Sequence, residues 1–225
     1  MTTLIEKPIP INSQFILTEF AARDEAELLR IAKMPGFVYS GLNAYSAADG
    51  SRMSVEDNVH TYLHDEALLA QTQEPRRTMY LAIRERASGK VVGAIEFMGG
   101  EHERDGQAEL AYFISPEHQG KGLATLAGAI AIEKALKMGI KPLWSEAHPD
   151  NIASRKVLEK LGYELKEDAQ LGRGGIIGAD GQLRGYTEAD GSPGRRVQYV
   201  TTEERLLQHI QAIQQEAAAK GRSGR

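Results

Sequence analysis

The segment "ISPEHQGKGLATLAGAIAIEKAL", residues 114–136, decides the fold prediction. It joins a short apolar run to a long alanine-rich run that is typical of a helix, and the turn between them holds Gly120, Lys121 and Gly122. A helix N-terminus presents unpaired N–H groups and the positive end of the helix dipole, so it favours an anion. Glycines at 120 and 122 leave room for a phosphate or pyrophosphate, and Lys121 adds a cation at the rim. Taken alone, such a turn more often only adopts unusual backbone angles.

The bulk composition is that of a soluble globular chain. Its 225 residues are 41% apolar and 26% charged, which suffices for one domain with a real core. The net charge of −4 argues against nonspecific nucleic-acid binding, which needs a basic face. The absence of cysteine excludes disulfides, thiolate zinc sites and a cysteine nucleophile. No stretch has the pattern of a signal peptide or a membrane span, so the sequence predicts a cytoplasmic protein without a membrane partner.

Hydrophobic periodicity and turn residues predict the element order β-α-α-β-β-β-α-β-α-β-β. Three consecutive strands imply an antiparallel meander, and the later β-α-β step implies at least one parallel pairing, so the fold class is α/β with a mixed sheet. Between the last two strands, residues 172–194 contain eight glycines and are expected to form a long loop. Strands are expected at 13–20, 78–86, 91–100, 107–115, 141–148, 163–171 and 195–204, and helices at 22–34, 54–73, 123–138, 150–162 and 202–220.

A second motif follows the glycine turn at a defined distance. Residues 119–124, "QGKGLA", match the pyrophosphate motif Gln/Arg-x-x-Gly-x-Gly/Ala, and residues 151–163, "NIASRKVLEKLGY", match a second motif about thirty residues on. In this order and on these elements, the chain resembles the GNAT acyltransferase superfamily. It is most similar to the RimJ/RimL branch, which includes ribosomal-protein N-terminal acetyltransferases. The resemblance covers roughly Met79 to Tyr163.

The resemblance implies the GNAT fold, a mixed, mostly antiparallel central sheet with flanking helices and two splayed parallel strands, at 109–115 and 143–148. A single GNAT domain is expected at 1–201, with the glycine-rich loop at 172–194, followed by a C-terminal helix and tail at 202–225. The implied activity is direct transfer of an acetyl group from acetyl-CoA to a primary amine, either a protein or peptide N-terminus or a small-molecule amine. The alternative is an acyl-CoA-binding module without catalysis, a sensor or scaffold. A homodimer through the C-terminal helix stays open.

The resemblance also assigns residues to acetyl-CoA, the expected cosubstrate. The pantetheine arm is expected to bond to the strand around Phe113 and to Asn151, although an asparagine at a helix start is equally a capping residue. The oxyanion would be served by a backbone N–H of that same strand. The full cofactor set is Tyr112, Phe113, Ile114, Gln119, Gly120, Lys121, Gly122, Leu123, Ala124, Asn151 and Ser154.

The resemblance also implies candidate catalytic residues. Many relatives place a tyrosine seven residues after the motif asparagine as general acid, and here that position is Leu158. RimL-like proteins have a serine three residues after it, here Ser154, which can donate a hydrogen bond to sulfur; the alternative is a small residue packed in the first helical turn. For the base, Glu146 leads, Glu109 is second and Glu96 a distant third. For each of these, a solvated glutamate on a strand face is the commoner situation.

Two histidines carry a possible metal pattern. His60 and His64 stand four residues apart on a predicted helix, so they could share a face as ligands. The sequence shows no third ligand beside them. Two surface histidines are therefore the better interpretation, and no metal is expected.

Overall fold

The computed structural model describes residues 7–37, 42, 53–73, 77–99, 106–166, 175–177, 183–185 and 196–223. The strands of the main sheet are β1 (Ile9–Pro10), β2 (Phe15–Glu19), β3 (Met79–Glu85), β4 (Val91–Met98), β5 (Ala108–Ile114), β6 (Pro142–Ala147), β7 (Glu164–Leu165) and β10 (Val197–Val200). The helices are α1 (Glu25–Ala32), α2 (Val55–His60), the π-helical segment η3 (Thr61–Ala67), α3 (Leu68–Ala70), α4 (Leu123–Lys137), α5 (Ile152–Leu161) and α6 (Glu203–Ser223), with 3-10 turns at Ala22–Asp24 and Pro116–His118.

The main sheet has the strand order β1-β2-β3-β4-β5-β6-β10-β7. Strands β3, β4 and β5 form the predicted antiparallel meander. Strands β5 and β6 are parallel, and α4 makes the crossover that such a pair requires. The predicted mixed α/β fold is therefore confirmed.

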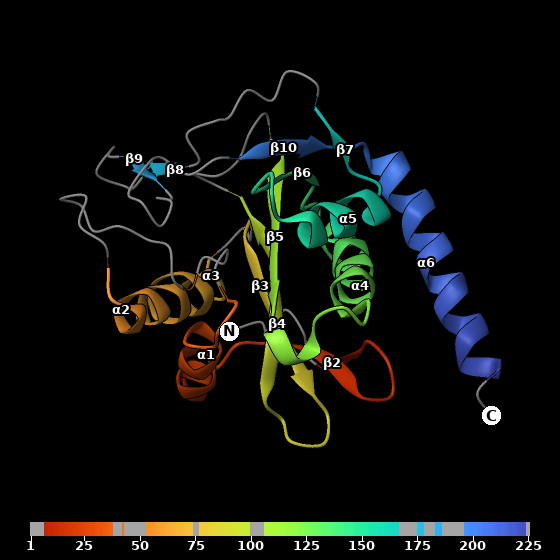
Figure 1. Ribbon diagram of the computed structural model, residues 1–225. Coiled ribbons are helices and arrows are strands. Elements are labelled where there is room, and N and C mark those ends of the chain that lie inside the picture. The colour runs from red at the N-terminus through yellow and green to blue at the C-terminus, as the bar shows by residue number, and fades with distance from the viewer. Residues whose placement is uncertain are drawn as a thin grey trace.

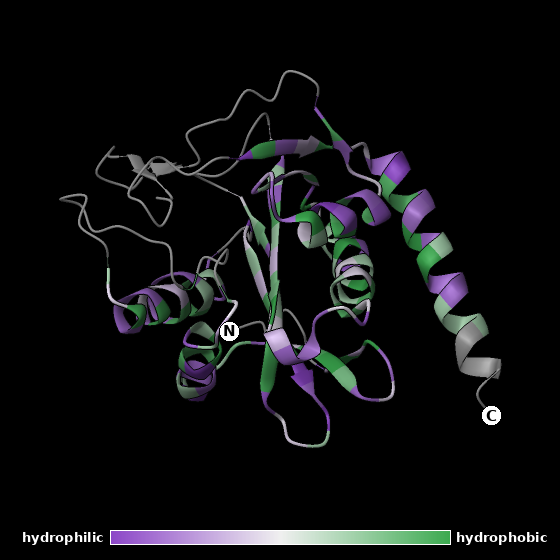
Figure 2. Cartoon of the chain, in the orientation of Figure 1, coloured by the Kyte–Doolittle hydropathy of each residue, from purple (hydrophilic) through white to green (hydrophobic). Residues whose placement is uncertain are grey.

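The helices form a layer on each face of the sheet (Figure 1). Helices α1 to α3 cover one face, whereas α4 and α5 cover the other, with α6 packed outside them. One apolar core, which includes Leu110 and Ile132, fills the α4–α5 side, and a second, which includes Tyr62 and Phe113, fills the α1–α3 side. Helix α4 is pale to green along most of its length in Figure 2 because small and apolar residues surround its axis. Leu110 and Phe113 both belong to β5 but lie in different cores, because successive side chains of a strand point to opposite faces of the sheet.

Local capping signals explain several helix ends. Ser54 precedes α2, and its hydroxyl oxygen accepts a hydrogen bond from the N–H of Asp57 at 3.0 Å, as its sequence position predicts. Asn151 caps α5, since its Oδ1 accepts from the N–H of Ser154 at 3.0 Å. Gly162 ends α5 in the left-handed region, with φ of 98°. The helix predicted over 54–73 exists, but its middle is π-helical, which no residue pattern indicated.

The last third of the chain differs most from the predicted elements. Strand β7 is only two residues long. Within the predicted loop at 172–194, β8 (Gly175–Ile177) and β9 (Leu183–Gly185) pair as a separate antiparallel hairpin, and the other residues of that loop lie outside the described part of the chain. These short strands were missed because they sit among glycines and lack the apolar alternation that identifies a strand.

The C-terminal helix α6 packs on the same body as the sheet. Its Leu206 and Ile210 are buried in the core on the α4–α5 side. At its start, Arg205 Nε donates to the carbonyl oxygen of Gly162 at 2.8 Å, and further along, Gln214 donates to Glu133 of α4 at 2.8 Å. Among the described residues, no helix combines the length and hydrophobicity needed to cross a bilayer.

Candidate active site

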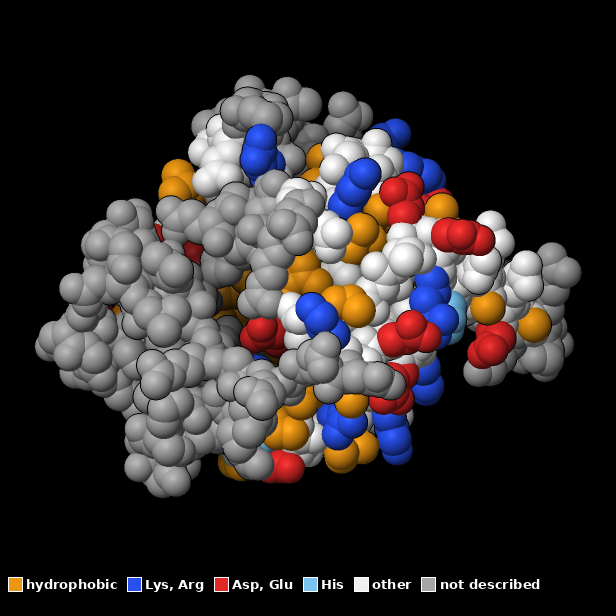
Figure 3. Space-filling view, turned by 90° about the horizontal axis from the view of Figure 1, so that it is seen from above, with side chains coloured by type: hydrophobic (Ala, Val, Ile, Leu, Met, Phe, Trp, Pro, Cys, Tyr) orange, Lys and Arg blue, Asp and Glu red, His pale blue; other side chains and the backbone are white. Residues whose placement is uncertain are grey.

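A cavity of about 640 Å³ opens beside the parallel strand pair. Seen from above, hydrophobic side chains are visible in a central hollow, with lysine or arginine side chains near it (Figure 3). Its walls come from the end of β5, the glycine turn, the start of α4, the first turns of α5 and the residues after α1. The lining residues are Gly36, Phe37, Tyr112, Phe113, Ile114, His118, Gln119, Gly120, Gly122, Leu123, Ala124, Thr125, Asp150, Asn151, Ile152, Ala153, Ser154, Lys156, Val157 and Lys160.

The cavity forms where β5 and β6 separate. Their ladder is limited to Ala108 opposite Pro142 and Glu109 opposite Trp144, with a register shift between the two pairs. Beyond this point, Ser145 of β6 is fully buried and its hydroxyl donates to the carbonyl oxygen of Leu110 at 2.7 Å. A side chain thus satisfies a β5 carbonyl that a continuing ladder would have paired. The outer half of β5, residues 111–114, therefore has a backbone edge that is not paired with β6 and that a ligand could pair with.

The glycine turn opens the start of α4 to the cavity. Gly120 and Gly122 have φ of 73° and 76°, and a Cβ added to either would have no atom within 4 Å. Gly122 is the residue before α4 and provides no side-chain cap. The first amides of a helix have no acceptor within it, so those of α4 point toward open space. The two interpretations of these glycines are therefore compatible: the backbone adopts positive φ at both, and the space beside the first amides of α4 is open to an anion.

The lysine of the glycine turn lies outside the lining of the cavity. Lys121 is not among the lining residues, and its ammonium donates to the carbonyl oxygen of Glu117 at 3.0 Å. Lys156 and Lys160 of α5 line it instead. The Gln119 side chain folds back and donates to the carbonyl oxygen of Ile114 at 2.9 Å, which holds the turn against the end of β5.

Two hydroxyl groups meet where β5 faces α5. The Tyr112 hydroxyl lies 2.8 Å from the carbonyl oxygen of Ser154 and 3.0 Å from Ser154 Oγ. Burial raises the pKa of the Tyr112 phenol, and the hydrogen bond with Ser154 only partly opposes this effect. Tyr112 therefore stays protonated and acts as a hydrogen-bond donor. Leu158, where many relatives have tyrosine, is fully buried in the core.

The three candidate bases lie on the opposite face of the sheet from this hydroxyl pair. Glu109 is three residues before Tyr112 on β5 and pairs with Trp144, which places Glu109 and Glu146 on the side of α1 to α3. Glu96 of β4 pairs with Ala111 and shares that face. Glu109 and Glu146 are half-buried and neither lines the cavity. The cavity nevertheless reaches both faces, since Phe113 and Phe37 line it from the α1 side.

The family comparison matches this arrangement. A family model described as an acetyltransferase (GNAT) domain matches residues 14–164, well over half of the chain. The chain belongs to the GNAT acetyltransferase family. The predicted fold class, the superfamily and the classification as an acyltransferase are thereby confirmed.

Solved GNAT structures resemble most of the chain at low sequence identity. RimJ of Mycobacterium smegmatis, in complex with CoA-disulfide, has a TM-score of 0.65 at 21% identity and covers 94% of this chain and 93% of its own. RimL, a ribosomal α-N-protein acetyltransferase in complex with coenzyme A, gives 0.58 at 15%, with coverage of 87% and 98%. The microcin C7 self-immunity acetyltransferase MccE, in complex with acetyl-CoA and AMP, gives 0.60 at 18%, with coverage of 88% and 97%. A search of curated proteins found no match. At these identities the neighbours show a common fold.

In this GNAT domain, ten of the eleven residues predicted to hold the cofactor line one cavity, and Lys121 is the exception. Of the predicted catalytic residues, Ser154 lines this cavity. Glu146 and Glu109 do not line it, and their side chains lie on the α1–α3 face of the sheet. Sequence reasoning missed Lys156 and Lys160. Their positions five and nine residues after Asn151, on the helix that the second motif begins, were the available signal.

Among the candidate bases, Glu96 has the environment that differs most from the expected one. It is buried, not solvated, and the Tyr62 hydroxyl donates to its Oε1 at 2.8 Å. Burial raises the pKa of Glu96 to about 7; the Tyr62 hydrogen bond opposes this effect, and the nearby Glu66 carboxylate adds to it. Glu96 does not line the cavity, so the packing around Tyr62 separates it from the acetyl donor site.

We expect Glu96→Gln to stabilise the protein at alkaline pH. A folded pKa above the usual 4.5 means that the unfolded chain releases this proton first, so the contribution of Glu96 to stability is lost as pH rises from about 4.5 to about 7. Glutamine carries no such penalty. The variant should match the wild type near pH 4.5 and exceed it by about 3 kcal/mol at pH 8 in urea unfolding. Glu204→Gln on the exposed face of α6 is the control, and a difference that does not vary with pH would contradict the assignment.

Proposed function

We propose that this GNAT domain is an acetyl-CoA-dependent N-acetyltransferase that transfers the acetyl group directly to a primary amine. The observation that carries the proposal is a single cavity that joins the uncapped start of α4 to the gap between β5 and β6. An anion site and an extended backbone edge in one cavity fit a ligand with a diphosphate at one end and an amide-bearing arm at the other. RimJ and RimL, which share the fold, were solved with forms of coenzyme A.

The residues present fit acetyl-CoA in charge and in shape. The amides at the start of α4 would take the pyrophosphate, and Lys156 and Lys160 add positive charge on the opposite wall. The outer half of β5 would pair with the pantetheine arm in place of β6. Asn151 uses its Oδ1 to cap α5, which leaves its side-chain N–H groups for that arm.

The chain supplies donors for the charge that develops during transfer. Acetyl-CoA, when bound, supplies the acetyl group as a thioester. A backbone N–H between Tyr112 and Ile114 would donate to the carbonyl oxygen as it gains negative charge. Ser154 would donate to the sulfur as the carbon–sulfur bond breaks. Tyr112 positions Ser154: its one hydroxyl proton is donated to the Ser154 carbonyl oxygen, so the phenol oxygen accepts from Ser154 Oγ, and the serine proton would turn from it to the sulfur.

The acceptor amine would approach from the α1–α3 face. The donor hydroxyls occupy the other face of β5, so the amine and the leaving sulfur lie on opposite sides of the reacting carbon. Glu146, or Glu109 next to it in the sheet, would accept the amine proton, directly or through water. An α-amine, with a pKa of about 8, is partly neutral near pH 7 and needs less help from a base to lose its proton than a lysine, with a pKa of about 10.4. Half-buried carboxylates outside the cavity therefore suit an N-terminal α-amine as the acceptor. The name of RimL, an α-N-protein acetyltransferase, gives this class of acceptor for RimL.

Thiol release from acetyl-CoA tests the proposal. The chain has no cysteine, so a thiol reagent reports only the released coenzyme A. We expect release that depends on an added amine, with peptides bearing free N-termini preferred over N-acetylated peptides that retain one lysine. Tight binding of acetyl-CoA with no amine-dependent release would instead favour the module without catalysis, for which the leucine at 158 is the supporting observation.

Three variants assign the roles within the same assay. Ser154→Ala should lower kcat about 10- to 100-fold with little change in acetyl-CoA affinity. Tyr112→Phe should give a smaller loss of the same kind, whereas Tyr163→Phe, which removes a buried hydroxyl bonded to Pro142 outside the cavity, is the matched control. Glu146→Gln should lose about 100-fold near neutral pH and recover as rising pH deprotonates the amine. Unchanged kcat in all three would reject these roles.

A further inference from the structure

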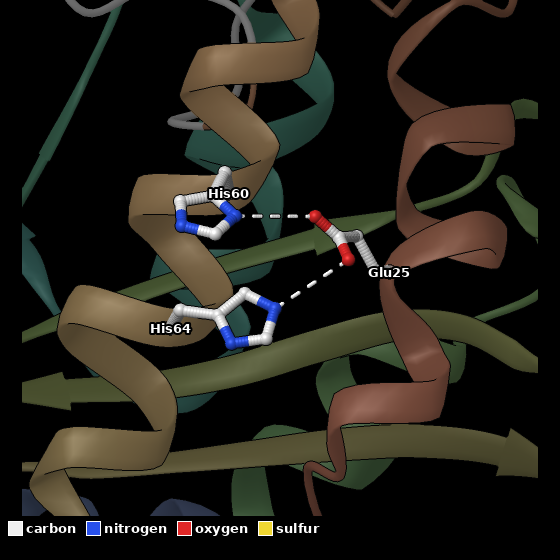
Figure 4. Close-up of side chains that lie close together, drawn as sticks. All are labelled: Glu25, His60 and His64. Atoms are coloured by element: carbon white, nitrogen blue, oxygen red, sulfur yellow. Dashed lines mark hydrogen bonds and ion pairs between the residues drawn. The ribbon is translucent and has the colours of Figure 1, made fainter.

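Three side chains from two helices converge on the outer surface of the α1–α3 layer. Glu25 at the start of α1 points toward His60 at the end of α2 and His64 in η3 (Figure 4). Their side chains are 44%, 59% and 30% exposed, so an ion from solvent can reach them. The sequence showed the two histidines without a third ligand, and the packing of α1 against α2 supplies one.

The two distances from the histidines to the Glu25 carboxylate are close to those between neighbouring ligands of a tetrahedral ion. His60 Nδ1 lies 3.4 Å from Glu25 Oε1, and His64 Nε2 lies 3.5 Å from Glu25 Oε2. Zinc bonds of about 2.0–2.1 Å place neighbouring ligand atoms about 3.3–3.4 Å apart in a tetrahedron. One ligand atom from each residue can be chosen so that all lie within 4.8 Å of one another. The side chains are exposed, so they can rotate to bring the three ligand atoms around one ion.

The arrangement of the rings also suits a shared ion. The imidazoles of His60 and His64 are stacked with centroids 4.6 Å apart and planes 24° from parallel, so both present an edge to the same carboxylate. The residues between them, Tyr62 and Leu63, are buried against the sheet, which turns the two histidines outward. The π-helical segment that carries His64 is a feature often found at functional sites.

We propose that Glu25, His60 and His64 form a binding site for a divalent transition-metal ion, best suited to Zn²⁺, that clips α1 to α2. Two imidazole nitrogens and one carboxylate oxygen are typical Zn²⁺ donors, and water completes the fourth position. The clip braces the wall on which the acceptor would bind, because Phe37 after α1 and Tyr62 of η3 both pack edge-on against Phe113 of the cavity. The site is separate from the acetyl donor cavity, so it does not depend on the proposed activity.

Metal titration of the tag-free protein without acetyl-CoA tests the site. We expect saturable 1:1 binding of Zn²⁺ by calorimetry, and visible absorption bands of four-coordinate Co²⁺ when Co²⁺ is the probe. At 100 times its Kd, Zn²⁺ should raise Tm by roughly 5–10 °C. Glu25→Gln, His60→Gln and His64→Gln should each weaken Zn²⁺ binding by at least about 10-fold and reduce that Tm rise.

Two matched variants separate this site from general surface binding. Glu56→Gln breaks another polar contact on the same layer, the exposed pair of Lys33 and Glu56, and should leave Zn²⁺ affinity unchanged. His209→Gln removes a surface histidine on α6 and should do the same. The proposal is overturned if Zn²⁺ gives no Tm rise, or if the rise persists in all three ligand variants. In either case the contacts of Glu25 with His60 and His64 only link the two helices and bind no metal.

Discussion

Gly122→Val should abolish acetyl-CoA binding and leave the fold in place. A valine at 122 fills the space in front of the first amides of α4, where an added Cβ would contact no atom of the protein itself. It also strains a backbone with φ of 76°, at a cost of about 1–3 kcal/mol in stability. We expect the Kd for acetyl-CoA to rise at least about 100-fold, which is about 2.7 kcal/mol, in isothermal titration calorimetry.

Gly139→Val is the matched control at the other end of α4. Gly139 has φ of 80°, an added Cβ there would also contact nothing within 4 Å, and the residue lies outside the cavity. Both variants therefore carry the same backbone strain, and only the one at 122 obstructs the anion site. If both variants bind acetyl-CoA as the wild type does, the diphosphate does not dock at α4. Equal loss in both would mean that strain, and not obstruction, weakens binding.

Arg84→Ala should lower the free energy of unfolding by about 3–5 kcal/mol. The Arg84 guanidinium is buried and makes a two-pronged contact with the Asp24 carboxylate, with Nη1 2.8 Å from Oδ1 and Nη2 bonded to Oδ2. Its Nε also donates to Thr18 Oγ1 at 2.7 Å. This pair ties the start of α1 to β3, and removal of the arginine leaves a buried carboxylate without its counter-charge. Urea unfolding near pH 7 measures the loss.

The comparison with an exposed pair makes the prediction specific. Arg30→Ala removes an arginine from the surface pair with Glu27 on α1, and we expect a change of about 0–1 kcal/mol. Arg84→Met combined with Asp24→Asn should lose less than Arg84→Met alone, because no buried charge is stranded. A loss at Arg84 no larger than that at Arg30 would show that the buried pair contributes little.

The elements around the motifs could be predicted because short-range signals define them. Gly122 before α4, Ser54 before α2, and Asn151 and Gly162 at the two ends of α5 each act within one helical turn. The meander of β3, β4 and β5 followed from three apolar runs without a helix between them. For the same reason, ten of the eleven predicted cofactor residues line one cavity: they are contiguous with these elements.

The contacts that set the chemistry could not be read in this way. Tyr112 and Ser154 are 42 residues apart, and Tyr62 and Glu96 are 34 apart, so only the packing of helices on the sheet brings them together. The sequence indicated a solvated Glu96 because a lone glutamate on a strand is usually exposed.

The sequence alone determined the family, the order of the main elements from β2 to β7 and the position of the glycine turn, because each depends on residues close together in the chain. The tertiary structure decided which side chains share an environment: the pairing of Tyr112 with Ser154, the burial of Glu96, the lysines of α5 in the cavity and Glu25 beside two histidines. The physical reason is that solvation, charge and hydrogen-bond geometry depend on distance in space, and the folded sheet and its helices set that distance.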